Sequence, residues 1–120
     1  MTTRVKGIRG AIQVETDTPD LVLGATAKLV SQMLSRNGLT PEDVVSVIFT
    51  TTPDLRSVFP AAAARDLGLG SVPLLCASEI DVSGALPRVV RVLMHAYPAQ
   101  TEIHHIYLDG AEVLRQDIAQ

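Results

Sequence analysis

The chain has 120 residues and a mass of 12.8 kDa, with 47% hydrophobic and 19% charged residues. A chain of this length removes roughly two-thirds of its unfolded surface from water, so we expect one domain over residues 1–120. The formal net charge is −3, and the aromatic residues are two tyrosines and two phenylalanines. Nucleic-acid binding depends on basic patches and stacking platforms, and this composition argues against it.

Sequence features bearing on location indicate a cytoplasmic protein. The longest uncharged run, residues 67–78, is broken by glycine and proline and is too short to cross a membrane. The first ten residues carry charge and glycine where a signal peptide would need an apolar stretch. Cys76 is the single cysteine, which excludes an intramolecular disulfide and fits a reducing compartment.

The first third of the chain predicts a strand followed by a helix. The alternation from Val5 to Glu15 favours a strand, in which the glycines at 7 and 10 mark a bulge or a close backbone approach. Thr18 and Pro19 are typical of a helix N-terminus, and the Asn-Gly pair at 37–38 is typical of its end. We therefore expect a helix between them.

The middle of the chain predicts two more strands around a helix. The β-branched apolar run 44–50 indicates a central strand buried on both faces. The alanine-rich segment from Phe59 to Leu67 favours a helix, and residues 72–76 favour another strand.

The last third predicts a helix and a hairpin. Apolar residues at 86, 89, 90, 93, 94 and 97 keep helical spacing, with Ser83 as a possible cap. The Asp-Gly pair at 109–110, between Ile103–Leu108 and Ala111–Leu114, is a strong hairpin signal. The predicted fold class is therefore α+β, a single domain with a mixed sheet and helices.

Arginine dominates the basic residues and favours an anionic ligand, because its planar fork matches a carboxylate. Arg9 lies between glycines that would let a ligand approach, although a surface arginine on a bulge fits equally well. Arg91 on the polar side of its predicted helix is by spacing alone a solvated residue. Glu79 follows a strand, where ligand groups are common, but a turn or cap residue is the more frequent case.

Other candidates have ordinary structural explanations. Cys76 is typical of an inert buried thiol, and Tyr107 of a core tyrosine with a satisfied hydroxyl. His104 and His105 are adjacent in a predicted strand and would point to opposite faces, so we expect no metal site. Taken alone, these residues allow an anion-binding site without specifying a reaction.

Six segments in chain order closely resemble one family, the small monofunctional chorismate mutases of the AroH class. They are Gly7-Ile8-Arg9-Gly10-Ala11, Thr52-Pro53-Asp54-Leu55, Val58-Phe59-Pro60-Ala61, Cys76 to Gly84, Arg91-Val92-Leu93-Met94, and Tyr107-Leu108 with Leu114-Arg115. The resemblance implies a mixed sheet with helices packed on one face, assembled into a homotrimeric pseudo-α/β barrel with active sites between subunits. It also implies the cofactor-independent Claisen rearrangement of chorismate to prephenate in aromatic amino-acid biosynthesis.

The same resemblance implies roles for individual residues. Arg91 matches the arginine at the ether oxygen, Arg9 a carboxylate clamp, and Tyr107 a hydrogen-bond donor to a carboxylate, while Glu79 and Cys76 match groups that contact the ring and its hydroxyl. The remaining implied binding residues are Phe59 and Leu114 as apolar walls, Arg65 at the mouth, Leu75, Ala77 and Ser78 in the lining, and Arg115 near the C-terminal tail.

Two departures from the family pattern affect substrate capture. Ala62 stands where relatives often have a lysine, and Leu75 stands where a threonine is common. We expect these changes to raise KM more than they lower kcat. Two other readings of the residues remain, a non-catalytic trimeric module that binds a small carboxylate, and another enzyme on a similar trimeric barrel, such as the small imine deaminases.

Overall fold

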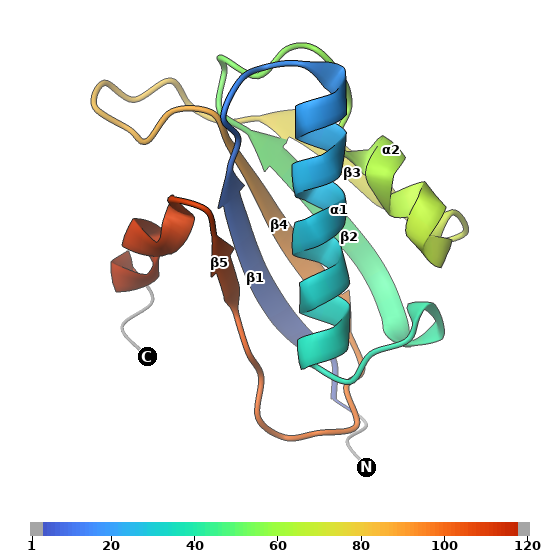
Figure 1. Ribbon diagram of the computed structural model, residues 1–120. Helices are drawn as coiled ribbons and strands as arrows, with labels where there is room; N and C mark the ends of the chain where they lie inside the picture. Colours follow the sequence, from blue (N-terminus) through green and yellow to red (C-terminus); the bar gives the residue numbers. More distant parts are fainter. Residues whose placement is uncertain (1–3, 118–120) are drawn as a thin grey trace.

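A mixed five-stranded sheet forms the centre of the molecule in the computed structural model, which describes residues 4–117 (Figure 1). The strand order is β3-β2-β4-β1-β5. β4 pairs antiparallel with β1 and β2, while β3 is parallel to β2 and β5 is parallel to β1. The strands are β1 (Lys6–Gln13), β2 (Val44–Thr51), β3 (Leu74–Ser78), β4 (Val89–Ala96) and β5 (Ile106–Leu108).

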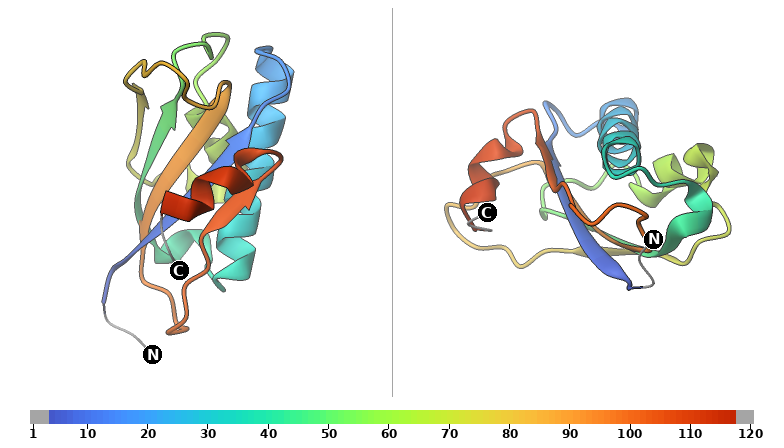
Figure 2. Two further views of the ribbon diagram at one scale, coloured as in Figure 1. Left: turned by 90° about the vertical axis from the view of Figure 1, so that its left-hand side faces the viewer. Right: turned by 90° about the horizontal axis from the view of Figure 1, so that it is seen from below.

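The helices α1 (Pro19–Arg36) and α2 (Ala61–Ala64) cover the same face of the sheet (Figure 2). α2 continues into the helical turn η2 (Arg65–Leu69), and the short 3-10 segments are η1 (Pro41–Asp43) and η3 (Ala111–Asp117). This arrangement confirms the α+β class with helices on one face. Among the described residues, no helix combines the length and apolar character that a membrane span needs.

Helix α1 begins and ends where its sequence predicts. The Thr18 side-chain oxygen accepts a hydrogen bond from the Leu21 backbone N–H at 3.3 Å, which caps the free end of the helix. At the other end, the buried Asn37 amide donates to the backbone oxygens of Met33 and His104. This side chain therefore also ties the helix to the segment before β5.

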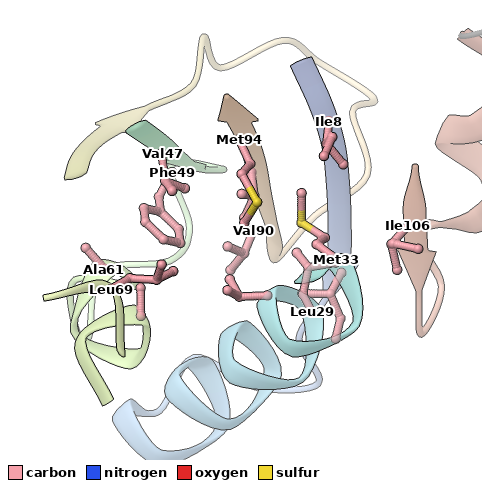
Figure 3. Packing of buried hydrophobic residues seen from close by; sticks show 14 of the residues in the cluster. Ile8, Leu29, Met33, Val47, Phe49, Ala61, Leu69, Val90, Met94 and Ile106 are labelled. Atoms are coloured by element: carbon pink, nitrogen blue, oxygen red, sulfur yellow. The ribbon is translucent and has the colours of Figure 1, made fainter. Parts of the chain in front are cut away.

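The main core lies between the sheet and the two helices (Figure 3). Ile8 and Ile12 on β1 and Met94 on β4 are fully buried there. Gly10 allows α1 to pack closely, because a Cβ at this position would lie 2.5 Å from the Met33 sulfur. Of the two alternatives expected for the glycines at 7 and 10, a bulge or a close approach, Gly10 shows the close approach, and β1 keeps an unbroken register with β4 at both positions.

The opposite face of the sheet, which we call the bare face, is covered by neither α1 nor α2 (Figure 2). Side chains alternate between the two faces of a strand, so the neighbours of the core residues point to this side. They include Arg9, Ile48, Thr50, Arg91 and Leu93. Leu93 is 37% exposed, and the bare face therefore combines charged groups with accessible apolar surface.

The predicted helix around residues 86–97 is wrong, because this segment forms the central strand β4. Its apolar residues fit a period of two as well, with Val90, Val92 and Met94 buried on one face. Valine favours strands, and Arg88 has a φ of 54°, which a right-handed helix cannot continue. The Asp54 carboxylate holds that residue by accepting from its N–H at 3.0 Å.

The predicted C-terminal hairpin is also wrong. Asp109 and Gly110 do turn the chain, with φ values of 52° and 102°, but η3 follows in place of a return strand. The Glu112 carboxylate accepts from the Gly110 N–H at 2.7 Å and stabilises the start of η3. Because β5 begins at Ile106, residues 104–105 precede the strand and do not alternate within it as predicted.

The expectation that the strand over 44–50 is buried on both faces is wrong as well. Only one face of β2 is fully buried, where Val47 and Phe49 pack in the core between the sheet and the helices. Val45 is 43% exposed, and Ile48 and Thr50 are half-buried. The apolar run thus reflects a strand inside the sheet whose second face lies open.

Candidate active site

A cavity of about 300 Å³ opens on the bare face between β1, β2, β4 and β5. Arg9, Arg91 and Tyr107 supply its polar groups, and Ile48 and Leu93 supply apolar lining. Three of the site residues implied by the family resemblance therefore meet within one chain, although they lie up to about 100 positions apart in sequence. Two arginines beside a tyrosine hydroxyl suit a ligand with carboxylate groups.

Sheet register explains why Arg91 and Tyr107 come together. Both are paired with Ala11, Arg91 from β4 on one side and Tyr107 from β5 on the other. Ala11 is buried and small, so the two longer side chains project past it on the same face. Without the parallel addition of β5, Tyr107 would not reach this cavity.

Glu79 forms an ion pair with Arg91, its Oε2 lying 3.3 Å from Arg91 Nε. The Glu79 side chain is 19% exposed and that of Arg91 36% exposed, so the pair is partly shielded from water. Glu79 comes directly after β3, and its backbone N–H donates to the Thr51 oxygen at 2.8 Å. A neighbouring cavity of about 320 Å³ contains Glu79 together with the loop 80–87, and Arg91 borders both cavities.

Arg9 is held at its backbone by a histidine. Its N–H donates to His105 Nδ1 at 2.9 Å, at the point where the β5 ladder has not yet begun. Burial lowers the pKa of His105, and the positive charge of Arg9 lowers that pKa further. The imidazole is therefore kept neutral, as the acceptor role of Nδ1 requires.

Tyr107 and Leu114 belong to a small cluster at the edge of the sheet. Tyr107 is only 8% exposed and packs with Val89 and Ala111, and Leu114 packs against the same group. Arg115 follows on η3 and is exposed. The turn at 109–110 thus carries Leu114 back over the tyrosine.

The remaining residues implied by the resemblance lie elsewhere in the chain. Phe59, Cys76, Ala77 and Ser78 line a separate cavity of about 470 Å³ beside the loop 55–60, which we call the loop cavity. Cys76 pairs with Phe49 and packs against the helix-covered core, on the opposite face from Arg91.

Two further residues of that set are exposed. Leu75 is 60% exposed at the sheet edge. Arg65 is exposed where α2 continues into η2. One chain therefore contains two separate groups of the implied site residues, one at the bare-face cavity and one at the loop cavity, while Arg65 and Leu75 line neither cavity.

Thr50 is a site residue that the sequence analysis missed. It lines the bare-face cavity, and its hydroxyl donates to Glu79 Oε2 at 2.6 Å. The available signal was a hydroxyl near the end of an apolar strand run, two positions after Ile48 on the same face. Among residues 4–117, histidine, cysteine and carboxylate side chains do not gather in threes as a metal site would require.

Comparison with known proteins places the chain in a family. The model of chorismate mutase type I matches residues 5–118. The chain is 50% identical to chorismate mutase AroH of Thermus thermophilus over 117 residues, covering 95% of this chain and 96% of the relative. It is 42% identical to chorismate mutase AroH of Bacillus subtilis over 118 residues, covering 96% and 93% respectively.

A solved structure agrees with these sequence matches. A chorismate mutase from Clostridium thermocellum superimposes with a TM-score of 0.87 at 44% identity, covering 90% of this chain and 98% of that one. The fold, the family model and the curated relatives therefore lead to the same enzyme class. The chain belongs to the chorismate mutase type I family, isomerases that convert chorismate to prephenate in aromatic biosynthesis.

Proposed function

We propose that Arg91 is the central catalytic group of this mutase and that the bare-face cavity is where the reaction takes place. The observation that carries the proposal is the position of Arg91, which borders two cavities and is paired with Glu79 through Nε. This contact is an ion pair without hydrogen-bond geometry at Nε, so it holds the guanidinium beside the carboxylate while the Nη groups can serve a ligand.

The chemistry of the rearrangement explains the need for this cation. The step is unimolecular, one C–O bond breaks while a C–C bond forms, and no proton is transferred. Negative charge grows on the ether oxygen as its bond stretches, so a fixed cation stabilises the transition state more than the substrate. Holding chorismate in its compact conformation also lowers the entropic part of the activation barrier for the rearrangement.

The other groups of the bare face suit the remainder of the substrate. Arg9 would bind a carboxylate, and Tyr107 would donate a hydrogen bond to a carboxylate. Glu79 would contact the ring or its hydroxyl, and Leu114 would close one side as an apolar wall. Arg115, which follows Leu114 on η3, would lie near the entrance.

The functional protein is proposed to be a cytoplasmic homotrimer in which a neighbouring copy completes each site. That copy would supply Phe59, Arg65, Leu75, Cys76, Ala77 and Ser78. Exposed apolar side chains support an interface, since Phe59 is 75% exposed, Ile80 86%, and Val82 and Val113 58% each. Such surface is costly to leave in water.

Turnover of chorismate by the wild type and by Arg91→Ala tests this proposal, followed by the loss of the diene absorbance. We expect kcat to fall roughly 10²–10³-fold, the usual loss when a single transition-state charge contact is removed. Arg36→Ala is the matched control, because Arg36 is an exposed arginine in the last turn of α1. Equal turnover by wild type and Arg91→Ala would refute the role of Arg91.

A further inference from the structure

The bare face contains the hydroxyl group of Thr50, which lies on β2 between the neighbouring strands β3 and β4. Thr50 on β2 is paired with Arg91 on β4 and with Ala77 on β3. All three side chains therefore project from the same face of the sheet. Ala77 is small, which leaves room above β3 for the Glu79 side chain to reach Thr50.

One carboxylate oxygen receives two contacts at this point. Thr50 Oγ1 donates to Glu79 Oε2 at 2.6 Å, and the same Oε2 lies 3.3 Å from Arg91 Nε. The first distance is typical of a strong hydrogen bond between a hydroxyl and a carboxylate. The second contact is longer, so the hydroxyl is the closer of the two groups that fix the carboxylate.

We propose that Thr50 is a positioning residue for the mutase reaction, orienting Glu79 so that Glu79 in turn orients the guanidinium of Arg91. The inference rests on the catalytic role proposed above for Arg91. A carboxylate free to rotate about its side-chain torsions would let the ion-paired guanidinium shift with it. Because catalysis of this rearrangement depends on a cation fixed in place before the charge develops, loss of orientation would lower kcat.

The surroundings make the hydroxyl effective. Glu79 is only 19% exposed, so water competes weakly with Thr50 for the carboxylate. The backbone of Glu79 is fixed independently by its N–H bond to the Thr51 oxygen. What Thr50 adds is control of the side chain, and valine at this position would keep the shape and strand preference while removing the donor.

The test measures kcat and KM for Thr50→Val, Thr50→Ser and Ser46→Ala. We expect Thr50→Val to lower kcat about tenfold with a smaller change in KM, as loss of a hydrogen bond to a charged group implies. Thr50→Ser keeps the donor and should restore kcat to within about twofold. Ser46 is the matched control, a hydroxyl on the same strand and face that pairs with His95 Nδ1 at 3.2 Å.

A double-mutant cycle separates positioning from a general structural role. In a Glu79→Gln background the amide carries no charge to pair with Arg91, so adding Thr50→Val should cost less than about twofold. An equal loss in both backgrounds, a normal kcat for Thr50→Val, or failure of Thr50→Ser to restore kcat would overturn the inference.

Two checks keep the outcomes distinct. Circular dichroism melting shows whether each variant folds, and Thr50→Ala replaces Thr50→Val if the valine variant does not fold. If Arg91→Ala keeps full turnover, the proposed function fails. If Arg91→Ala loses turnover as expected while Thr50→Val has wild-type kcat, only the positioning role of Thr50 fails.

Discussion

The two faces of the sheet differ in how completely the chain buries their side chains. On the covered face, Ile8, Phe49 and Met94 are 0% exposed beneath the helices. On the bare face, Arg9 and Arg91 line an open cavity, and Leu93 remains 37% exposed. The covered face therefore supplies the folding free energy, while the bare face leaves charged groups and apolar surface open to a ligand or to another copy of the chain.

Adjacent residues of one strand thus serve different purposes. Phe49 packs in the core and Thr50 bonds to Glu79, although they are neighbours on β2. On β4, Val92 is buried and Arg91 borders the cavities. Alternation along a strand lets eight residues build both a core and a polar site, so substitutions on the two faces should have separable effects on stability and activity.

The largest difference between effects on stability and effects on turnover is expected for Phe49→Ala and Arg91→Ala. Removing the fully buried ring should cost about 3–5 kcal/mol of unfolding free energy, because a cavity remains in the core. Arg91→Ala should cost less than about 1 kcal/mol of unfolding free energy, since its ion pair is partly exposed, while lowering kcat roughly 10²–10³-fold. Urea unfolding and chorismate turnover on both variants measure the contrast, and similar losses of stability would contradict it.

A smaller contrast is expected between a glycine beneath α1 and an exposed glycine within α1. A methyl group at Gly10 would clash with the Met33 sulfur, so Gly10→Ala should destabilise by about 1–3 kcal/mol. At Gly24, in α1, a Cβ would meet nothing within 4 Å, and Gly24→Ala should stabilise by about 0.5–1 kcal/mol. Thermal melts of the two variants should shift in opposite directions, and shifts of the same sign would show that packing against α1 is not the cause.

The smallest effect is a pH dependence at the edge of the bare face. The lowered pKa of His105 means that the unfolded chain binds its proton more readily, so stability falls as pH drops below the ordinary histidine pKa of about 6.5. Stability from this group is fully present above that pH. His105→Gln should flatten the decline between pH 7 and 5, measured by urea unfolding, whereas parallel curves for the two proteins would exclude His105 as its source.

Local signals in the sequence predict much of the covered face. Thr18 and Asn37 mark the ends of α1, and Gly10 marks the close approach of helix and sheet. These features depend on residues near in sequence or on a contact that only one residue type permits. The α+β class follows from the order of the predicted strands and helices along the chain.

The order and identity of the C-terminal elements could not be predicted in the same way. In residues 86–97 the apolar positions satisfy both helical and strand periods, and pairing of β4 with β1 and β2 decides between them. The turn at Asp109 and Gly110 has the geometry expected of a hairpin, yet Ala111 packs beneath Tyr107 and η3 follows. Tertiary contacts override local preference in both places.

The residues of the candidate site could be predicted from the sequence only through the family resemblance. Helical spacing predicted Arg91 to be a solvated surface residue. The segment is in fact the strand β4, in which Arg91 projects from the bare face. The contact between Arg91 and Glu79 depends on two strands brought together by β2, and no local pattern encodes it. Thr50 is likewise a common strand residue whose partner becomes evident only in three dimensions.

The central claim is that the group on the bare face of one copy works with the group around the loop cavity of another. Arg91→Ala removes a residue of the bare-face group, and Arg65→Ala removes a residue proposed to come from the same copy as the loop-cavity group. The two variants are purified, mixed at equal concentration, unfolded and refolded together, and then assayed with chorismate. Random mixing in a symmetric trimer should leave about one site in four with both groups intact, giving activity well above either parent. Activity equal to the mean of the two parents would show that each chain carries its whole site and would contradict the account.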